Sequence, residues 1–594
     1  MNFVEKTPSQ ELCEENFAMN LGVSKNCSRS LNGSLGQSFN AGQVFTPQPL
    51  AHWVAEMLLE ALDGKKAPVI VDPACGEGDL LHSIKGLNPK AKVFGADIDK
   101  NVVETASSKL GEKESLIVAD SLVPEKGVRA DLGWSKLPFP DRIDGIIANP
   151  PWGADLMHSR EQVKHAGYTL ARGQFDTWEL FVELSLKILK RGGVAAFILP
   201  DSIFLPEHQK TREFLHNNSS ILLIARLGEG FFENVFRGTS VVVVQKSKPK
   251  KKHRIEVFRL NKNHRKLVLT FGQTLGYARK QLSHEIEQKR FQEDSYARWD
   301  IDAPEDETTT ITLISSHEGE WTKWLSTGRG VEMSKYGKAI VCPECGVARP
   351  APRNKPVSSC LACGFSGRIE LFTQSTIVEP FSQIKKGWMP LIVGEDVDRY
   401  SILPSRSIKL GVKGINYKSL ETYSERRLLV RKTGLGLKAS ITTDNFMTNQ
   451  VVFHYFGNGR TATPDFYLSY VLGVFSSRVM FAYHLRTNGE NEWRSHPYLT
   501  QKIIGRLPIP LPVEGQGSWK QAKAIAKEVD KVIHSGQISK SRDLRIEGLV
   551  AGLYGFTNAD MSWVHNVISS AQELEPMRAL QLIDIKQISP LLVS

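Results

Sequence analysis

Hydrophobic positions along the chain follow two different periods, and the change of period separates short strands from longer helices. Residues 49–62 carry apolar side chains at helical spacing, and residues 176–189 repeat that pattern until glycines at 192 and 193, which we expect to end the helix. Apolar runs of strand length lie at residues 68–72, 92–97, 115–120, 143–148, 194–199, 221–227 and 239–244. Strands that alternate with helices in this way predict an α/β fold with a largely parallel sheet.

Polar residues stand where four of these strands end. Asp72 opens a turn that contains Gly76 and Gly78, Asp97 ends the second strand, and Asp120 ends the third. A single aspartate at such a place is often a helix cap. Because the carboxyl ends of parallel strands meet at one edge of the sheet, four polar ends together predict a ligand site there.

The fourth strand ends in Asn149-Pro150-Pro151-Trp152. Both prolines fix φ and lack an N–H, so the Asn149 side chain and the Pro150 carbonyl present two acceptors that point the same way. Two such acceptors suit an NH2 group, and the Trp152 ring offers a stacking surface for a planar ring that carries the amine. A proline-stiffened turn after a buried strand is the alternative interpretation.

The length of the chain indicates the number of domains, and its net charge indicates the class of partner. The chain has 594 residues, enough for three or four units, and a net charge of +11 that favours a polyanionic partner. Residues 1–38 are rich in Ser, Asn, Gly and Glu, so we expect a disordered leader. The N-terminus lacks signal-peptide character and no apolar run reaches membrane-spanning length. We therefore expect a cytoplasmic protein without a membrane partner.

Four of the seven cysteines form two Cys-x-x-Cys pairs, each followed by glycine: Cys342 with Cys345, and Cys360 with Cys363. Two such turns can bring four thiolates to one tetrahedral zinc ion. A closed shell of sulfur would be structural, because no position stays open for water. Four free thiols are the alternative.

The segments at the strand ends resemble the gamma-type amino-methyltransferases of DNA, the group that includes TaqI-like and type I modification enzymes. The matching segments, in that family's order, are Phe45-Thr46-Pro47, Asp72–Gly78, Gly95-Ala96-Asp97, Val118-Ala119-Asp120 and Asn149–Trp152. The resemblance implies a class I S-adenosylmethionine-dependent methyltransferase, an α/β Rossmann-like fold with a seven-stranded sheet and helices on both faces.

The same resemblance assigns the site residues. Thr46 and the loop after Asp72 would hold the methionine part of S-adenosylmethionine, Asp97 the ribose, and Asp120 the adenine amine of the cofactor. The full cofactor set is Phe45, Thr46, Asp72, Pro73, Ala74, Gly76, Gly78, Asp97, Ile98, Asp120 and Ser121, the catalytic set is Asn149, Pro150, Pro151 and Trp152, and the base-stacking set is Trp152 and Phe236. Thr46 could instead cap the helix that follows Pro47, and Phe236 could be a core residue.

The expected reaction is methylation of the N6 amine of a flipped adenine in double-stranded DNA, as part of a restriction-modification or defence system. In the family that the chain resembles, serine at the position of Asn149 would favour cytosine-N4, so asparagine points to adenine-N6. Methylation of cytosine-C5 needs a nucleophilic thiol, and Cys75 inside the cofactor loop is a poor candidate. The alternatives are a methyltransferase of RNA or of a protein glutamine amide, and a non-catalytic DNA specificity subunit. Separate restriction or defence subunits could be partners, and the chain could act as a monomer.

Short segments of the second half, residues 325–330, 391–400 and 507–510, resemble the target-recognition domain of TaqI-like and type IIG enzymes. We expect a methyltransferase domain at 39–250, a basic linker at 251–310, and a mixed α+β target-recognition domain at 311–515. A zinc ribbon at 338–368 would lie inside that domain. Residues 516–594 would form a C-terminal helical region, because apolar residues recur at helical spacing from 519 to 533.

Overall fold

The computed structural model describes residues 45–570, apart from residues 112–114, 154–156, 174, 233–236, 295–296, 303–307, 318–320, 335–336, 353–356, 384, 434–435, 458–463 and 488–498. The leader expected at residues 1–38 and the base-stacking residue Phe236 therefore lie outside the described residues.

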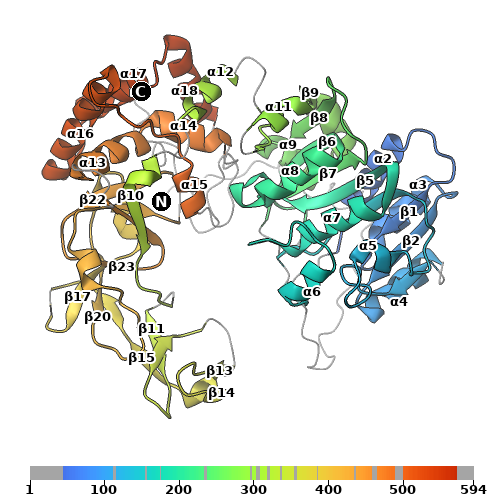
Figure 1. The fold of residues 1–594 in the computed structure, drawn as a ribbon, viewed down its shortest axis with the longest axis horizontal. Coiled ribbons are helices and arrows are strands. Elements are labelled where there is room, and N and C mark those ends of the chain that lie inside the picture. The colour runs from blue at the N-terminus through green and yellow to red at the C-terminus, as the bar shows by residue number, and fades with distance from the viewer. Residues whose placement is uncertain are drawn as a thin grey trace, which may run out of the picture. The chain divides into compact units, whose positions relative to one another are not determined.

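The N-terminal half is built on one nine-stranded sheet with helices against both of its faces (Figure 1). The strands are β1 (Val69–Asp72), β2 (Lys92–Asp97), β3 (Leu116–Val118), β4 (Ile143–Ala148), β5 (Leu189–Pro200), β6 (Ser220–Gly228), β7 (Thr239–Gln245), β8 (Arg254–Arg259) and β9 (His284–Glu287). Their spatial order is β3-β2-β1-β4-β5-β7-β6-β8-β9, and β7 runs antiparallel to both of its neighbours. The seven strands predicted from the sequence are all present.

Alternation along each strand sends successive side chains to two separate cores. In β7, Val241 and Val243 join one core, whereas Val242 and Val244 join the other. The first core is covered by α2 (Gln48–Ala61), α3 (Asp79–Leu87), α4 (Lys100–Leu110), α9 (Lys262–Phe271) and α10 (Leu275–Leu282). The second is covered by α5 (Ala130–Trp134), α6 (Arg160–His165), α7 (Thr177–Ile188), α8 (Gln209–Asn218) and α11 (Gln288–Glu293).

The sheet continues past residue 250, into residues 251–310, which the sequence predicts as a basic linker. Ile255 and Val257 of β8 are buried in one core and Phe258 is buried in the other. β8 is a parallel neighbour of β6, and β9 pairs antiparallel with β8. Burial of these apolar side chains outweighs the charged flank, so residues 254–259 and 284–287 are sheet and not linker.

A second difference concerns the glycines after α7. The helix ends at Ile188 and β5 begins at Leu189, so the glycines lie inside the strand. A Cβ at Gly193 would lie 2.9 Å from the Asp144 carbonyl oxygen of β4. Glycine is therefore required here by the close approach of two strands and not by the end of a helix.

The direction in which successive strands are added to the sheet reverses between β1 and β4, which are parallel neighbours. The chain leaves β1 toward β2 and β3 on one side, and later strands extend the sheet on the other side. Such a switch point opens a crevice at the carboxyl ends of the strands. The glycine loop after Asp72 and the segment that starts at Asn149 both begin at this crevice.

The C-terminal half is a mixed α+β structure of small sheets followed by helices, as predicted. The strands are β10 (Leu325–Arg329), β11 (Lys338–Val341), β12 (Ala348–Pro350), β13 (Val357–Ser359), β14 (Ser366–Arg368), β15 (Thr373–Thr376), β16 (Val378–Pro380), β17 (Trp388–Ile392), β18 (Val397–Asp398), β19 (Ser401–Ile402), β20 (Arg406–Lys409), β21 (Arg427–Arg431), β22 (Ala439–Thr442), β23 (Met447–Thr448) and β24 (Val452–Gly457). The sheets are β10-β24-β21-β22, β16-β20-β17-β23, β12-β11-β15, β13-β14 and β18-β19. The helices are α12 (Thr308–Ser315), α13 (Pro464–Phe475), α14 (Arg478–Thr487), α15 (Gln501–Gly505), α16 (Gly517–Ser535), α17 (Lys540–Leu553) and α18 (Asn558–Ser570).

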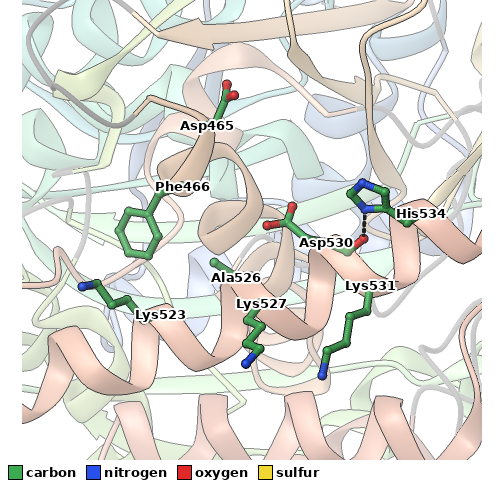
Figure 2. A pocket seen from close by; sticks show the side chains of 8 residues that line it. All are labelled: Asp465, Phe466, Lys523, Ala526, Lys527, Asp530, Lys531 and His534. Atoms are coloured by element: carbon green, nitrogen blue, oxygen red, sulfur yellow. Dashed lines mark hydrogen bonds between the residues drawn. The ribbon is translucent and has the colours of Figure 1, made fainter.

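An open hollow of about 660 Å³ lies between the start of α13 and one side of α16 (Figure 2). Lys523, Lys527 and Lys531 follow one another along α16, and Asp530 accepts a 2.8 Å bond from Arg426. None of the predicted site residues lines this hollow.

Within the part of the chain that the structure describes, every helix is too short or too polar to cross a membrane.

Candidate active site and cysteine cluster

Asn149 follows the last residue of β4, and its side chain is held by Thr46. The Asn149 Nδ2 donates to Thr46 Oγ1 at 3.1 Å, and Thr46 is buried. Thr46 does not cap α2, because the N-cap of that helix is Pro47 and no side chain bonds to its first amides. Since the amide nitrogen points at Thr46, the Asn149 oxygen is turned the other way as the acceptor of the pair.

The Trp152 ring is half-buried and packs against both cores of the sheet. The Phe232 ring lies edge to face against it, at 5.3 Å between centroids and an interplanar angle of 79°. Phe232 was not among the site residues predicted from the sequence. Its position fixes the orientation of the Trp152 ring beside Asn149.

Gly153, directly after Trp152, is anchored by Asp176, which was not among the residues predicted from the sequence. Gly153 N donates to both carboxylate oxygens of Asp176, at 2.8 and 3.1 Å. Asp176 in turn precedes α7, and its own amide donates to Glu179 Oε1 at 2.7 Å. The start of α7 therefore holds the chain directly after the Asn-Pro-Pro-Trp segment. The only sequence signal for Asp176 is its place as a helix start.

The glycine loop between β1 and α3 is shaped by the buried carboxyl group of Asp72 and the half-buried carboxyl group of Asp97. Asp72 accepts from Ala74 N at 2.9 Å, and Asp97 accepts from Gly76 N at 3.0 Å and from Asp99 N at 3.0 Å. Burial raises the pKa of Asp72 to about 8 and also raises the pKa of Asp97. Both carboxyl groups therefore fix the loop in addition to any contact with a ligand.

The glycines of this region meet different demands. Gly76 has φ +49° and faces open space, since a Cβ there would meet no atom within 4 Å. Gly78 has φ +77° and begins α3, where only a residue without a side chain adopts this conformation readily. A Cβ at Gly95 would lie 2.9 Å from the Cys75 Cβ, so this glycine lets the loop approach β2.

The Cys75 thiol lies in the same loop and is buried. Its burial, together with the neighbouring Asp72 and Asp97, raises its pKa well above the ordinary value. A protonated thiol is a poor nucleophile. The structure thus agrees with the sequence-based exclusion of Cys75 as a catalytic nucleophile.

Asp120 and Ser121 stand after β3. One Asp120 oxygen accepts from Leu122 N and Val123 N at 3.0 and 3.1 Å, and the other lies 2.7 Å from His158 Nε2. Ser121 Oγ donates to the Pro73 carbonyl at 2.5 Å and ties β3 to the glycine loop. Asp120 thus closes a turn and does not cap a helix, which was the alternative for a single aspartate. His158 is a neighbour that the sequence did not indicate.

The four cysteines lie on two turns of the same geometry. Gly346 N donates to the Cys342 carbonyl at 3.0 Å, Gly364 N donates to the Cys360 carbonyl at 2.9 Å, and both glycines have positive φ. All four sulfur atoms lie within 4.8 Å of one another. The Cys342–Cys363 and Cys345–Cys360 sulfur pairs are each 3.6 Å apart. The cluster therefore has the compact arrangement of a metal-binding site.

The strand β11 links this cluster to the rest of the C-terminal half. Ile340 packs with Cys342, Cys360 and Phe372 in a small core under the two turns. Its neighbour Ala339 points into the core that includes Leu391 and Ile408 of the β16-β20-β17-β23 sheet. One short strand thus shares its two faces between the cysteine turns and that sheet.

The sheet, its switch point and the glycine loop at the carboxyl end of β1 are those of the class I S-adenosylmethionine-dependent methyltransferase fold that the sequence predicts. Residues 35–270 match the N-6 DNA methylase family, and residues 389–509 match the TaqI-like C-terminal specificity domain. The chain therefore combines an N-6 DNA methylase domain with a TaqI-like specificity domain. The cysteine cluster lies between the two matched regions.

Known proteins resemble parts of this chain. The type II methyltransferase M.VspI of Vibrio sp. (strain 343) is 31% identical over 157 residues, which cover 26% of this chain and 36% of that protein. The methylase subunit of the type I restriction enzyme EcoEI of Escherichia coli is 25% identical over 225 residues, which cover 36% and 44%. The chain thus spans less than half the length of both relatives.

Among solved structures, the type IIL restriction-modification enzyme MmeI in complex with DNA aligns with a TM-score of 0.51 and 11% identity. The alignment covers 90% of this chain and 75% of that chain. The ATP-dependent type ISP restriction-modification enzyme LlaBIII aligns with a TM-score of 0.50 and 11% identity, over 84% of this chain and 39% of that chain. At this identity the likeness establishes a shared fold.

Proposed function

We propose that this chain is a site-specific DNA methyltransferase that transfers a methyl group from S-adenosylmethionine to the N6 amine of a flipped adenine. The observation that carries the proposal is the bond from Asn149 Nδ2 to Thr46, at the carboxyl end of β4. This bond engages the Asn149 nitrogen, so we assign the Asn149 oxygen as the acceptor for a substrate amine. The two matched domains supply the expected partner, double-stranded DNA in a restriction-modification or defence system.

An exocyclic amine on adenine is a weak nucleophile because its lone pair is delocalised into the ring. The Asn149 oxygen and the Pro150 carbonyl would accept the two amine hydrogens, which favours a pyramidal nitrogen and returns the lone pair to it. Bound S-adenosylmethionine would supply an electrophilic methyl group on its sulfonium. Rate enhancement would come from positioning and electrostatics, and the proton would leave after transfer. No covalent intermediate on the protein is required.

The residues of the crevice fit this cofactor. The space beside Gly76 is open, and the apolar side chains of Phe45 and Ile98 are 50% and 48% exposed. We assign the loop from Asp72 to Gly78 and Thr46 to the methionine part, Asp97 to the ribose, and Asp120 to the adenine amine. The Thr46 hydroxyl can accept from Asn149 and donate to the cofactor at the same time.

Adenine in a duplex is stacked and paired, so the base must leave the helix to reach Asn149. Trp152 would replace part of the lost stacking. Base contacts that set the methylated sequence are expected from the specificity domain at 389–509.

The test is single-molecule sequencing of DNA from cells that express the wild-type chain, Asn149→Ala, or the exposed control Asn101→Ala. We expect methyl-adenine in one short sequence motif with the wild type and the control, and none with Asn149→Ala. Binding of S-adenosylmethionine by the purified Asn149→Ala protein would show that it is folded. Methyl label that enters RNA or protein instead of DNA would contradict the proposal.

We further propose that the four cysteines bind a structural zinc ion. Zinc–sulfur bonds of about 2.3 Å in a tetrahedron place neighbouring sulfurs roughly 3.8 Å apart, close to the 3.6 Å of the two sulfur pairs. A core as small as the one under these turns needs such a crosslink to be stable. Because β11 is shared, loss of zinc is expected to disturb the β16-β20-β17-β23 sheet as well.

Metal analysis of the purified protein should find one zinc per chain. Cys345→Ser should lower the zinc content and weaken DNA binding, while cofactor binding persists, because the glycine loop belongs to a different core. Cys27→Ser is the matched control, since this cysteine lies outside the two Cys-x-x-Cys pairs. Full zinc occupancy in Cys345→Ser, or no zinc in the wild type, would contradict the assignment.

A further inference from the structure

Arg237 lies against the segment that follows Trp152. It precedes β7 in the chain, but its guanidinium reaches Gly153, the residue directly after the Asn-Pro-Pro-Trp segment. A Cβ at Gly153 would lie 2.7 and 2.8 Å from the two terminal nitrogens of Arg237. Gly153 also has φ +63°, a backbone conformation that favours glycine here. A positive charge is thereby built into the rim of the candidate base site.

The Asp176 carboxylate, which lies near Arg237, is already engaged. Asp176 accepts two bonds from Gly153 N at 2.8 and 3.1 Å, and it lies 3.9 Å from Arg237 Nη1. Direct bonds between arginine and carboxylate are about 2.7–2.9 Å long. The Arg237 side chain is 50% exposed, whereas that of Asp176 is 18% exposed. The guanidinium thus lies beside Gly153 and Asp176 while half of the side-chain surface faces solvent.

A nucleotide that rotates out of a duplex brings its flanking phosphates to the rim of the base pocket. The planar fork of arginine suits bidentate bonding to phosphate oxygens. We propose that Arg237 binds a backbone phosphate next to the flipped adenine, and that Asp176 is the positioning residue that holds Gly153 beneath it. The inference rests on the proposed function, because it needs a nucleotide at Asn149. The contact positions the strand and carries no sequence preference.

The experiment uses the full-length protein and a duplex that contains the motif found by sequencing. Dissociation constants are measured over a range of salt concentrations for the wild type, Arg237→Ala and Arg254→Ala. Arg254 is the matched control: its side chain is 46% exposed, and it pairs with Glu285 at the far edge of the sheet. We expect Arg237→Ala to weaken binding about 10-fold and to reduce the salt slope by about 0.9, the value for one phosphate contact.

The phosphate itself is tested with duplexes that carry a neutral methylphosphonate on either side of the target adenine. One of these substitutions should weaken wild-type binding as much as Arg237→Ala does, and it should add nothing in the variant. Equal additional loss in the variant, or an unchanged salt slope, would overturn the inference and leave the proposed function intact. A wild type that methylates no DNA would overturn both. Unchanged cofactor affinity of Arg237→Ala shows that the variant is folded.

Discussion

The bond between Thr46 and Asn149 gives the sharpest prediction. Thr46→Val keeps the shape of the side chain but removes the hydroxyl that accepts from Asn149 Nδ2 at 3.1 Å. Thr46 is 8% exposed, so water does not readily take the place of the hydroxyl. The Asn149 amide then loses the hydrogen bond that orients its nitrogen, and the rotated orientation presents an NH2 group to the substrate instead.

The size of the effect follows from the burial of the bond. Loss of one partner of a buried hydrogen bond costs about 1–3 kcal/mol. If this cost falls on the orientation needed for methyl transfer, the rate falls by roughly 5-fold to 150-fold, since about 1.4 kcal/mol corresponds to a factor of ten. Thr46→Ser keeps the hydroxyl and is expected to stay within about threefold of the wild type.

The assay is single-turnover methyl transfer to the target duplex at saturating cofactor. Cofactor affinity is measured separately, because the resemblance also assigns Thr46 to the methionine part, and weaker binding alone would be overcome at saturation. A single-turnover rate of Thr46→Val equal to that of Thr46→Ser would refute the orienting role. A change confined to the dissociation constant of the cofactor would assign Thr46 to cofactor binding alone.

Two further predictions concern the sheet and its loop. Because burial raises the pKa of ligand-free Asp72 to about 8, a positively charged cofactor should bind more tightly as pH rises toward 8, by up to about tenfold per unit below that value. Asp72→Asn should remove this part of the slope; identical slopes in binding titrations of the two proteins would argue against a direct contact. Gly193→Ala places a Cβ 2.9 Å from the Asp144 carbonyl oxygen and should lower the free energy of unfolding by about 1–3 kcal/mol. Gly86→Ala, with open space around the new Cβ, should not destabilise, and equal melting temperatures for both variants would contradict the steric argument.

The sequence by itself determined seven strands of the first sheet, the glycine loop and the four cysteines. Seven strands were predicted because their apolar runs are local and end in polar or glycine residues. The start of α3 at Asp79 follows from Gly78, whose positive φ is a local demand on the backbone. The cysteine turns were readable for the same reason, since each is complete within five residues.

Only the tertiary structure decided which side chains meet at the crevice. Thr46 and Asn149 are 103 positions apart, and Thr46 faces Asn149 instead of capping α2 because the start of that helix lies beside the end of β4. Gly153, Asp176 and Arg237 come together for the same reason, from three separate connections of the sheet. The place of β8 in the sheet was also hidden, because its neighbour β6 is distant in sequence and a charged run precedes it. Periodicity reports which face of an element is buried, whereas partners across a sheet depend on the packing of the whole domain.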